Sequence, residues 1–267
     1  MKGRLREPSV SLLEDAGLGP EQPGERALAF PCRNAPVDVL LVRAADKPEY
    51  VQDGVVDCGI TGQDLVAERG ARVEELLELG FGSCRLEVAV PEESRYDRLG
   101  DLAGASVATV YPSLTRRLMP VEVDLVDVTG SVEIAPRLGL ADAIVDLVSS
   151  GNTLRTNGLR SLGPLFSSQA VLIGRDGADT ARLASMMRAV VEARAHRYLM
   201  FNAEEAKLAE VCRIIGSDSP SVLPLAAPGM VAVHALVPSA EVWRLLPELS
   251  EAGASSILVV PVERMAL

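Results

Sequence analysis

Residues 129–159 read TGSVEIAPRLGLADAIVDLVSSGNTLRTNGL, and this stretch is the most informative in the chain. The aliphatic run at 143–148 predicts a buried strand. It is followed by Ser149-Ser150-Gly151-Asn152-Thr153-Leu154, where we expect a turn and the start of a helix. Such a turn presents outward backbone N–H groups, and glycine lets a phosphate approach closely, so the stretch predicts an anion-binding loop. An ordinary capped turn at a strand end is the alternative interpretation.

Outward from this loop, short aliphatic runs alternate with helical stretches, which is typical of an α/β core. The nearly continuous apolar runs indicate strands buried on both faces, as in a parallel sheet covered by helices. The predicted strands are 37–42, 55–60, 86–90, 107–110, 121–128, 143–148 and 170–173. The predicted helices are 48–52, 63–67, 132–138 and 180–196.

From residue 197 the pattern becomes β-α-β-β-α-β, which predicts a separate ferredoxin-like domain joined through the helix at 180–196. Its expected strands are 198–202, 221–226, 231–237 and 257–262, and its expected helices are 203–214 and 239–251.

Composition excludes several classes of function. The 267 residues carry a net charge of -11 and only 3% aromatic residues, which argues against binding nucleic acid. No apolar run is long enough to span a membrane, and the first residues lack the core of a signal peptide. The four cysteines are scattered and there are only two histidines, so neither a zinc site nor a disulfide framework is expected. These features predict a cytoplasmic protein with reduced thiols.

Other motifs follow one another in a specific order along nearly the whole chain. They are Lys2-Gly3-Arg4-Leu5, Arg43-Ala44-Ala45-Asp46, Asp57-Cys58-Gly59-Ile60-Thr61-Gly62 with Asp64, Cys84-Arg85-Leu86, Ala108-Thr109-Val110-Tyr111-Pro112, Arg197-Tyr198-Leu199-Met200 and Val231-Ala232-Val233-His234. With the loop at 149–154, this combination resembles ATP phosphoribosyltransferase, the first enzyme of histidine biosynthesis, in its long form with a C-terminal regulatory domain.

The resemblance implies a two-lobed, periplasmic-binding-protein-like catalytic core and an ACT-like, ferredoxin-like C-terminal domain. Lobe I is expected at residues 1–84 and 165–190, and lobe II, which contains the phosphoribosyl-diphosphate loop, at 85–164. The regulatory domain is expected at 195–267.

The resemblance also implies the reaction and the residues that serve it. N1 of the adenine of ATP attacks the anomeric carbon of 5-phosphoribosyl 1-diphosphate, and diphosphate leaves with Mg²⁺. Residues 149–154 would cradle the 5-phosphate, while Glu133 and Asp146 would hold the ribose. Lys2 and Arg4 would face the diphosphate. The residues implied to line the nucleotide cleft are Arg43, Asp64, Arg85 and Tyr111.

In the C-terminal domain, the resemblance implies inhibition by histidine and a hexamer built from dimers, with AMP as a competitor at the nucleotide site. The residues that match the inhibitor site are Asn202, Ser221, Leu236 and Ser256. Asn202 replaces an acidic residue found in some relatives, and Ser221 replaces the usual threonine, so we expect weaker inhibition by histidine.

Several of these residues also have plainer interpretations. Glu133 is expected at a helix start, where an acid is favoured by the helix dipole alone. Asp64 is also compatible with a cap for the helix after Gly62. Arg43 and Arg85 are also compatible with surface ion pairs.

The sequence departs from the family at its start, where a short hydrophobic strand normally precedes the Lys-Gly-Arg motif. A start assigned too far downstream, a trimmed sequence or a protein that dispenses with the strand would each explain this. Two alternatives to the transferase therefore stay open: a non-enzymatic two-lobed protein that binds a small anion, and a folded but inactive variant that lacks the first strand.

Overall fold

The computed structural model describes residues 4–19, 28–216 and 220–266. The described chain divides into two compact units. Unit 1 comprises residues 4–10, 28–30 and 38–184, and unit 2 comprises residues 11–19, 31–37, 185–216 and 220–266. None of the helices in the described ranges has the length and hydropathy needed to cross a membrane.

The smaller sheet of unit 1 is antiparallel and has three strands in the order β3-β10-β4. Its strands are β3 (Cys58–Gly62), β10 (Ala170–Gly174) and β4 (Glu74–Glu78). β10 is buried along its whole length because it lies between the other two strands. Helices α2 (Lys47–Gln52) and α3 (Gln63–Arg69) contact this sheet, and Val51 of α2 packs with Val171 and Ile173.

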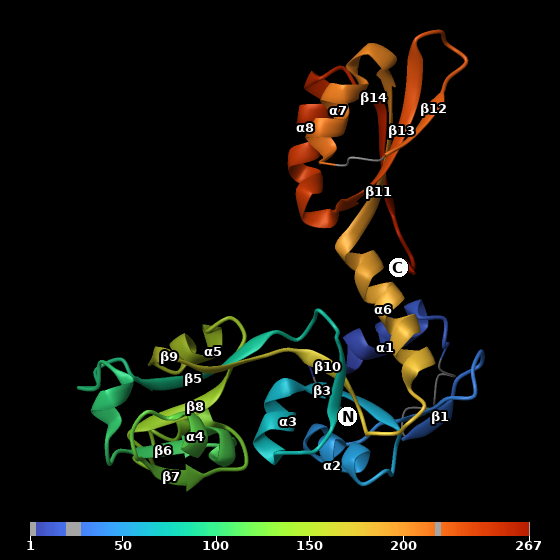
Figure 1. The fold of residues 1–267 in the computed structure, drawn as a ribbon. Coiled ribbons are helices and arrows are strands. Elements are labelled where there is room, and N and C mark those ends of the chain that lie inside the picture. The colour runs from blue at the N-terminus through green and yellow to red at the C-terminus, as the bar shows by residue number, and fades with distance from the viewer. Residues whose placement is uncertain (1–3, 20–27, 217–219, 267) are drawn as a thin grey trace. The chain divides into compact units, whose positions relative to one another are not determined.

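The larger sheet of unit 1 has five strands in the order β7-β6-β8-β5-β9. They are β7 (Asp124–Asp127), β6 (Ser106–Thr109), β8 (Ala143–Val148), β5 (Cys84–Pro91) and β9 (Leu159–Ser168). Two core clusters accompany this sheet, one with α4 (Pro112–Leu118) and the other with the 3₁₀ turn η3 (Val132–Ile134) and α5 (Asn152–Thr156). β4 is followed by β5, and β9 by β10, so the chain passes twice between the two sheets (Figure 1).

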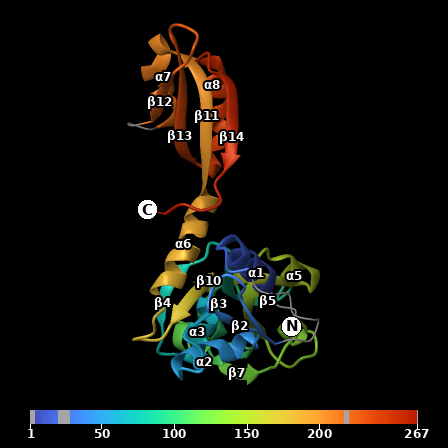
Figure 2. The same cartoon turned by 90° about the vertical axis from the view of Figure 1, so that its right-hand side faces the viewer.

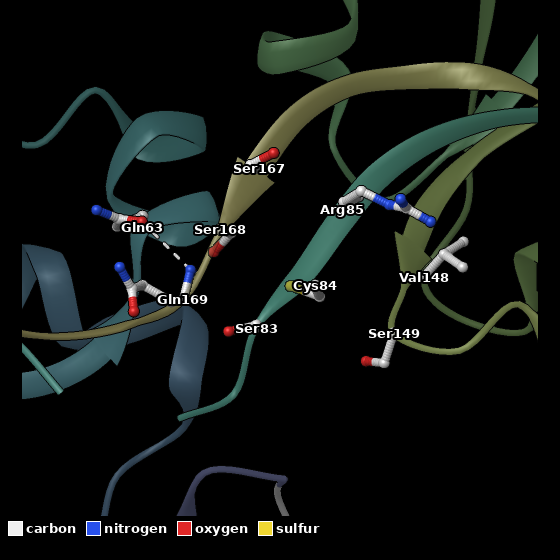
Figure 3. A pocket seen from close by; sticks show the side chains of 9 residues that line it. All are labelled: Gln63, Ser83, Cys84, Arg85, Val148, Ser149, Ser167, Ser168 and Gln169. Atoms are coloured by element: carbon white, nitrogen blue, oxygen red, sulfur yellow. Dashed lines mark hydrogen bonds between the residues drawn. The ribbon is translucent and has the colours of Figure 1, made fainter. Parts of the chain in front are cut away.

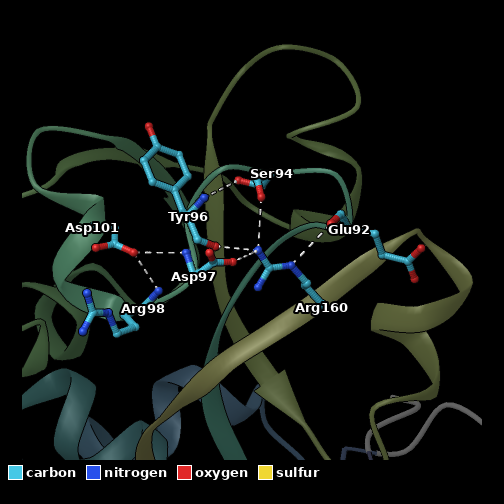
Figure 4. A network of polar contacts seen from close by, with 7 residues as sticks. All are labelled: Glu92, Ser94, Tyr96, Asp97, Arg98, Asp101 and Arg160. Carbon is cyan, nitrogen blue, oxygen red and sulfur yellow. Dashed lines mark hydrogen bonds and ion pairs between the residues drawn. The ribbon is translucent and has the colours of Figure 1, made fainter.

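A polar network fixes the loop that follows β5 (Figure 4). Arg160 of β9 donates hydrogen bonds to the carbonyl oxygens of Ser94 and Tyr96, at 3.1 and 2.7 Å. It also forms an ion pair of 2.9 Å with Asp97. The 3₁₀ turn η2 (Leu99–Leu102) closes the same loop. These contacts stabilise the end of the sheet and involve none of the predicted site residues.

The α/β class is confirmed, but the expectation of a parallel sheet is wrong for most strands. Among the strand pairs whose register is assigned in the described residues, two are parallel, β6–β7 and β6–β8. The other assigned strand pairs in the described residues of the two larger sheets of unit 1 are antiparallel. A separate two-stranded sheet pairs β1 (Ala29–Pro31) with β2 (Asp38–Leu40). Buried aliphatic runs reveal that both faces of a strand are covered, and they carry no information on strand direction.

Several predicted boundaries also change. The helix expected at 132–138 is only the turn η3, since Pro136 has no N–H to donate and Gly139 adopts a left-handed φ of +70°. The strand expected at 37–42 is limited to β2, and the strand expected at 55–60 lies at 58–62 as β3. The sequence does not predict β1, β4, β9 or α4, nor the other short 3₁₀ turns of this part of the chain.

Unit 2 contains a β-α-β-β-α-β fold, as predicted. Its elements are β11 (His196–Glu204), η4 (Glu205–Lys207), α7 (Leu208–Ile215), β12 (Ser221–Pro224), β13 (Met230–Pro238), η5 (Ser239–Glu241), α8 (Val242–Glu251) and β14 (Ser255–Pro261). The antiparallel sheet has the order β12-β13-β11-β14, which is ferredoxin-like. The helix expected from residue 203 begins only at Leu208 because β11 continues to Glu204.

Helices α7 and α8 cover one face of the unit 2 sheet (Figure 2). Phe201, Val233 and Leu249 are buried in this core. The alternate residues of the strands, including Tyr198 and Leu236, lie on the other face and are partly exposed. The sheet therefore presents an open face within unit 2.

Two further helices complete the described chain. α6 (Ala181–Ala195) leads directly into β11 and confirms the helix predicted at 180–196. α1 (Arg6–Asp15) was not predicted. Arg194 of α6 forms an ion pair of 2.6 Å with Asp15 and donates a hydrogen bond of 3.1 Å to Ser11, so the end of α1 is held against α6.

Candidate active site

A pocket of about 460 Å³ lies in unit 1, close to where β5, β8 and β9 meet the segments that join the two sheets. Figure 3 shows its lining residues: Gln63, Ser83, Cys84, Arg85, Val148, Ser149, Ser167, Ser168 and Gln169. Arg85 is the only charged side chain among these nine described residues. The pocket therefore brings together two predicted site residues, Arg85 of β5 and Ser149 of the loop after β8.

The predicted anion loop has an open, turn-like backbone. Gly151 precedes α5 with a left-handed φ of +74°, and no atom lies within 4 Å of the position that a Cβ would take. Leu154 is buried in the core beside β8 and anchors the loop, whereas Ser150 and Thr153 are exposed. The loop is consequently fixed at its helical end and accessible to a ligand along its N-terminal half.

Asp146 lies on β8, three residues before Ser149. Burial raises the pKa of its carboxyl group, and the negative charge of Glu133 raises it further. The backbone N–H of Leu147 donates a 2.8 Å hydrogen bond to Asp146 and opposes this rise. Glu133, on η3, is thus close enough to Asp146 to influence its ionisation.

Asp64 is the centre of a buried polar cluster, with only 1% of its surface exposed. The hydroxyl group of Tyr111 donates a 2.9 Å hydrogen bond to Oδ2, and that of Ser168 donates a 2.6 Å bond to Oδ1. Arg4 approaches Oδ1 at 3.5 Å. Both carboxylate oxygens of Asp64 thus bind side chains of other elements, which a helix cap alone would not require. The structure joins three predicted residues, Arg4, Asp64 and Tyr111, in one cluster.

The remaining predicted residues of the catalytic core that the structure describes belong neither to the pocket lining nor to the Asp64 cluster. Arg43 is exposed just before the 3₁₀ turn η1 (Ala44–Asp46) and does not line the pocket. Lys2 lies outside the described residues. Ser150 and Asn152 are exposed on the loop, where the side chain of Asn152 accepts a hydrogen bond from Arg155.

Sequence reasoning missed two residues of the site. Glu87 is a charged residue within the aliphatic run LEVAV, an anomaly that could have singled it out. It forms an ion pair of 2.7 Å with Arg85. Ser168 binds Asp64 from 104 positions away, and no local signal marks such a contact.

In unit 2, the residues predicted to bind histidine lie mainly on the open face of the sheet. Leu236 of β13 is paired with Tyr198 of β11, Asn202 is further along β11, and Ser221 of β12 is paired with His234. Ser256 has a left-handed φ of +51°, close to a register shift between β11 and β14.

Comparison with known proteins assigns the chain to a family. The family model for ATP phosphoribosyltransferase matches residues 43–193, and the model for the C-terminal domain of HisG matches residues 193–264. The chain belongs to the ATP phosphoribosyltransferase family. It is 41% identical to the ATP phosphoribosyltransferases of Halobacterium salinarum and Methanocella arvoryzae. The alignments cover 99% of this chain and 97% and 96% of those proteins.

Solved structures agree with this assignment. A chain of the ATP phosphoribosyl transferase (HisG:HisZ) complex from Thermotoga maritima matches with a TM-score of 0.61 and 25% identity, over 72% of this chain and 96% of that chain. The arginine-, lysine- and histidine-binding protein ArtJ from Geobacillus stearothermophilus matches with a TM-score of 0.50 and 13% identity, over 72% of this chain and 80% of that chain. The second similarity concerns the fold alone and agrees with the periplasmic-binding-protein-like architecture that the family resemblance implies.

Membership of this family makes the chain a phosphoribosyl-transferring enzyme of histidine biosynthesis. The family's reaction joins the phosphoribosyl group of 5-phosphoribosyl 1-diphosphate to N1 of ATP and releases diphosphate. The comparisons do not favour a non-enzymatic binding protein.

Proposed function

We propose that unit 1 binds 5-phosphoribosyl 1-diphosphate with its 5-phosphate in the loop at 149–154. The observation that carries this proposal is the convergence of Ser149, at the start of the loop, with Arg85 in one pocket. A phosphate at the loop would meet backbone N–H groups and the hydroxyl groups of Ser149, Ser150 and Thr153. The left-handed conformation of Gly151 leaves its outward side free of any side chain.

The ribose is held by Asp146 and by Glu133, whose negative charge raises the pKa of Asp146. Ionised carboxylates accept hydrogen bonds from ribose hydroxyl groups and stabilise the positive charge that develops at the anomeric carbon as diphosphate leaves. The raised pKa of Asp146 costs folding stability at neutral pH, where the group must ionise while partly buried. Such a cost is typical of a residue that is retained for its chemistry.

ATP supplies the nucleophile, so the protein needs to position the two substrates and contributes no attacking side chain. We assign Tyr111, Asp64 and Arg43 to the nucleotide side of the site, whereas Arg85 shares its pocket with Ser149 and faces the phosphate loop. Arg4, paired with Asp64, and Lys2 face the diphosphate. The Asp64 cluster would hold the guanidinium of Arg4 in place before substrate arrives.

Mg²⁺ enters with the diphosphate and ATP. It prefers oxygen ligands, which the phosphate groups of both substrates supply together with water and a few carboxylates. The described residues contain no group of three metal-ligating side chains. Asp146 and Glu133 are the carboxylates in this part of the site that can meet a cation bound to the substrate.

The proposed division of labour between domains follows the family pattern. Lobe I comprises residues 1–84 and 165–190, lobe II comprises 85–164, and the regulatory domain comprises 195–267. Histidine would bind on the open face of the unit 2 sheet, at Asn202, Ser221, Leu236 and Ser256. A left-handed serine is uncommon and is typical of positions retained for function, which supports Ser256 in this role.

We further propose that the protein acts in the cytoplasm as a hexamer built from dimers, with AMP competing at the nucleotide site. No disulfide joins the cysteines of the described residues, which is typical of a reducing compartment and supports the location. The open face of unit 2 supports contacts with ligands or other copies of the chain.

The site assignment is tested by replacing Ser149 and Thr153 together with alanine. We expect the KM for 5-phosphoribosyl 1-diphosphate to rise about 100-fold or more, because two hydrogen bonds to a charged group are lost and each is worth about 1.5–3 kcal/mol. The KM for ATP should change little. Thr156→Ala, on the exposed surface of the same helix, is the matched control. An equal rise in both KM values would place the 5-phosphate elsewhere.

A further inference from the structure

Three successive residue pairs lie on one face of the paired strands β5 and β8, and their surroundings change from the apolar core to the pocket. Residues directly opposite each other in an antiparallel pair share a face, and so do residues two apart in a strand. Ala89 is opposite Ile144, and both are buried in the core. Glu87 is opposite Asp146 in the next step. In the third step Arg85 is opposite Val148, and both of these residues line the pocket.

Glu87 therefore occupies the step between the apolar core and the pocket. Only 5% of its surface is exposed, although a carboxylate is costly to bury without a partner. Its ion-pair partner is Arg85, at 2.7 Å, whose side chain is 57% exposed. Figure 3 shows the Arg85 side chain extending toward Val148, at the start of the loop.

Apart from the ion pair with Arg85, the surroundings of Glu87 do not favour a carboxylate. Like charges directly opposite each other in a sheet are destabilising, and Asp146 lies opposite Glu87. Burial already raises the pKa of Asp146, and Glu133 raises it further. A neutral residue at this position would avoid the like charge opposite Asp146, and what the carboxylate adds is the ion pair with Arg85.

We propose that Glu87 is a positioning residue that holds the Arg85 guanidinium at the mouth of the pocket for the phosphate group bound by the loop at 149–154. This proposal rests on the proposed function of that loop. An arginine that is already oriented loses less conformational entropy when it binds a phosphate, and it keeps donors free after pairing with one carboxylate. Glu87 itself would not touch the substrate, since it lies one step deeper than the lining residues.

The test measures binding of ribose 5-phosphate, and separately of ATP, to the full chain by calorimetry. Glu87→Gln keeps the shape of the side chain and removes its charge, while Arg85→Met removes the guanidinium. We expect each variant to bind ribose 5-phosphate about 10-fold more weakly, the factor that corresponds to about 1.4 kcal/mol. The double variant should be no weaker than Arg85→Met alone, because Glu87 acts through Arg85. Glu87→Asp should restore part of the affinity.

Asp97→Asn is the matched control, since Asp97 also pairs with an arginine in unit 1 but lies outside the pocket. Its affinity for ribose 5-phosphate should equal that of the wild type. Normal binding by Glu87→Gln, or additive losses in the double variant, would overturn the positioning role while leaving the loop assignment intact. Failure of the wild type to bind ribose 5-phosphate would overturn both. A loss of binding by Glu87→Gln with an equal loss of ATP binding and a lowered Tm would identify Glu87 as merely structural.

Discussion

The hydroxyl group of Tyr111 donates a hydrogen bond of 2.9 Å to Oδ2 of Asp64, across 47 positions of sequence. Tyr111 immediately precedes α4, which is next to the five-stranded sheet, and Asp64 lies in the first turn of α3, which is next to the three-stranded sheet. Ser168 and Arg4 meet the same carboxylate. The contact thus links the two sheets of unit 1 at the place where we assign the nucleotide and the diphosphate.

This hydrogen bond predicts an alkaline dependence of stability. Burial, followed by the charge of Asp64, raises the pKa of Tyr111 well above its ordinary value. The folded protein therefore retains this proton after the unfolded chain has begun to lose it, near pH 10. The contribution of Tyr111 is fully present below that pH and declines as pH rises further, since the unfolded state then binds fewer protons.

We expect Tyr111→Phe to lower the free energy of unfolding by about 1 kcal/mol at pH 7. The difference from the wild type should shrink above about pH 10. Urea unfolding of both proteins between pH 7 and 11 measures this, with Tyr50→Phe as the control for loss of an exposed phenol. A difference that stays constant through pH 11 would show that the Tyr111 hydroxyl is not buried against Asp64.

A second prediction concerns two acids on the same segment whose pKa values shift in opposite directions. Burial raises the pKa of Asp146, so its stabilising contribution exists at low pH and is lost as pH rises through the folded-state pKa. Hydrogen bonds from Ser106 lower the pKa of Asp142. The contribution of Asp142 to folding stability is therefore present above the ordinary pKa of a carboxyl group and is lost as pH falls through the lowered pKa.

Asp146→Asn should therefore stabilise the protein at pH 7, by about 0.5–2 kcal/mol, while lowering kcat/KM about 100-fold or more. Asp142→Asn should destabilise it and leave kcat/KM nearly unchanged. Thermal unfolding and steady-state kinetics at pH 7 distinguish the two. An Asp146→Asn variant that is both less stable and fully active would contradict the role given to this residue. Glu133 raises the pKa of Asp146, so the Glu133→Gln variant should show the acidic limb of its kcat/KM profile at lower pH than the wild type does.

A third prediction compares two glycines at either end of α5. Gly151 and Gly158 have φ of +74° and +66°, and at both positions the space that a Cβ would take has no other atom within 4 Å. Alanine at either site should cost about 1 kcal/mol of stability, because the left-handed conformation disfavours a Cβ.

Only Gly151→Ala should raise the KM for 5-phosphoribosyl 1-diphosphate, since its Cβ would occupy the approach to the phosphate loop. Gly158→Ala is the control with matched backbone strain. Kinetics with each substrate varied, together with Tm, separate the effects. Equal KM values for the two variants would show that the phosphate does not approach Gly151.

The sequence predicted most of the buried strands because their aliphatic runs are continuous, and β8 even has the predicted bounds. It missed β4, in which two leucines lie between glutamates, and β9, which contains Gly163 and Pro164 beside a register shift. A local pattern does not specify strand direction either, so the mixed sheet was not foreseen.

The candidate site likewise contains features that are contiguous in sequence and contacts that depend on the tertiary fold. The loop at 149–154 was predictable because its strand, glycine and hydroxyl residues are contiguous. The partners of Asp64 come from far along the chain, and their meeting depends on the tertiary fold. The pairing of Glu87 with Asp146 likewise requires the register between β5 and β8, which no local pattern specifies.

The most direct test of the central claim is product formation by the full chain from ATP, 5-phosphoribosyl 1-diphosphate and Mg²⁺, with released diphosphate hydrolysed to draw the reaction forward. We predict N1-(5-phosphoribosyl)-ATP, identified by absorbance and mass, and its suppression by histidine would add support for the regulatory site in unit 2. Product in the absence of suppression would leave the catalytic assignment in place. Absence of product while both substrates bind would contradict the account and favour a folded protein that binds these anions without joining them.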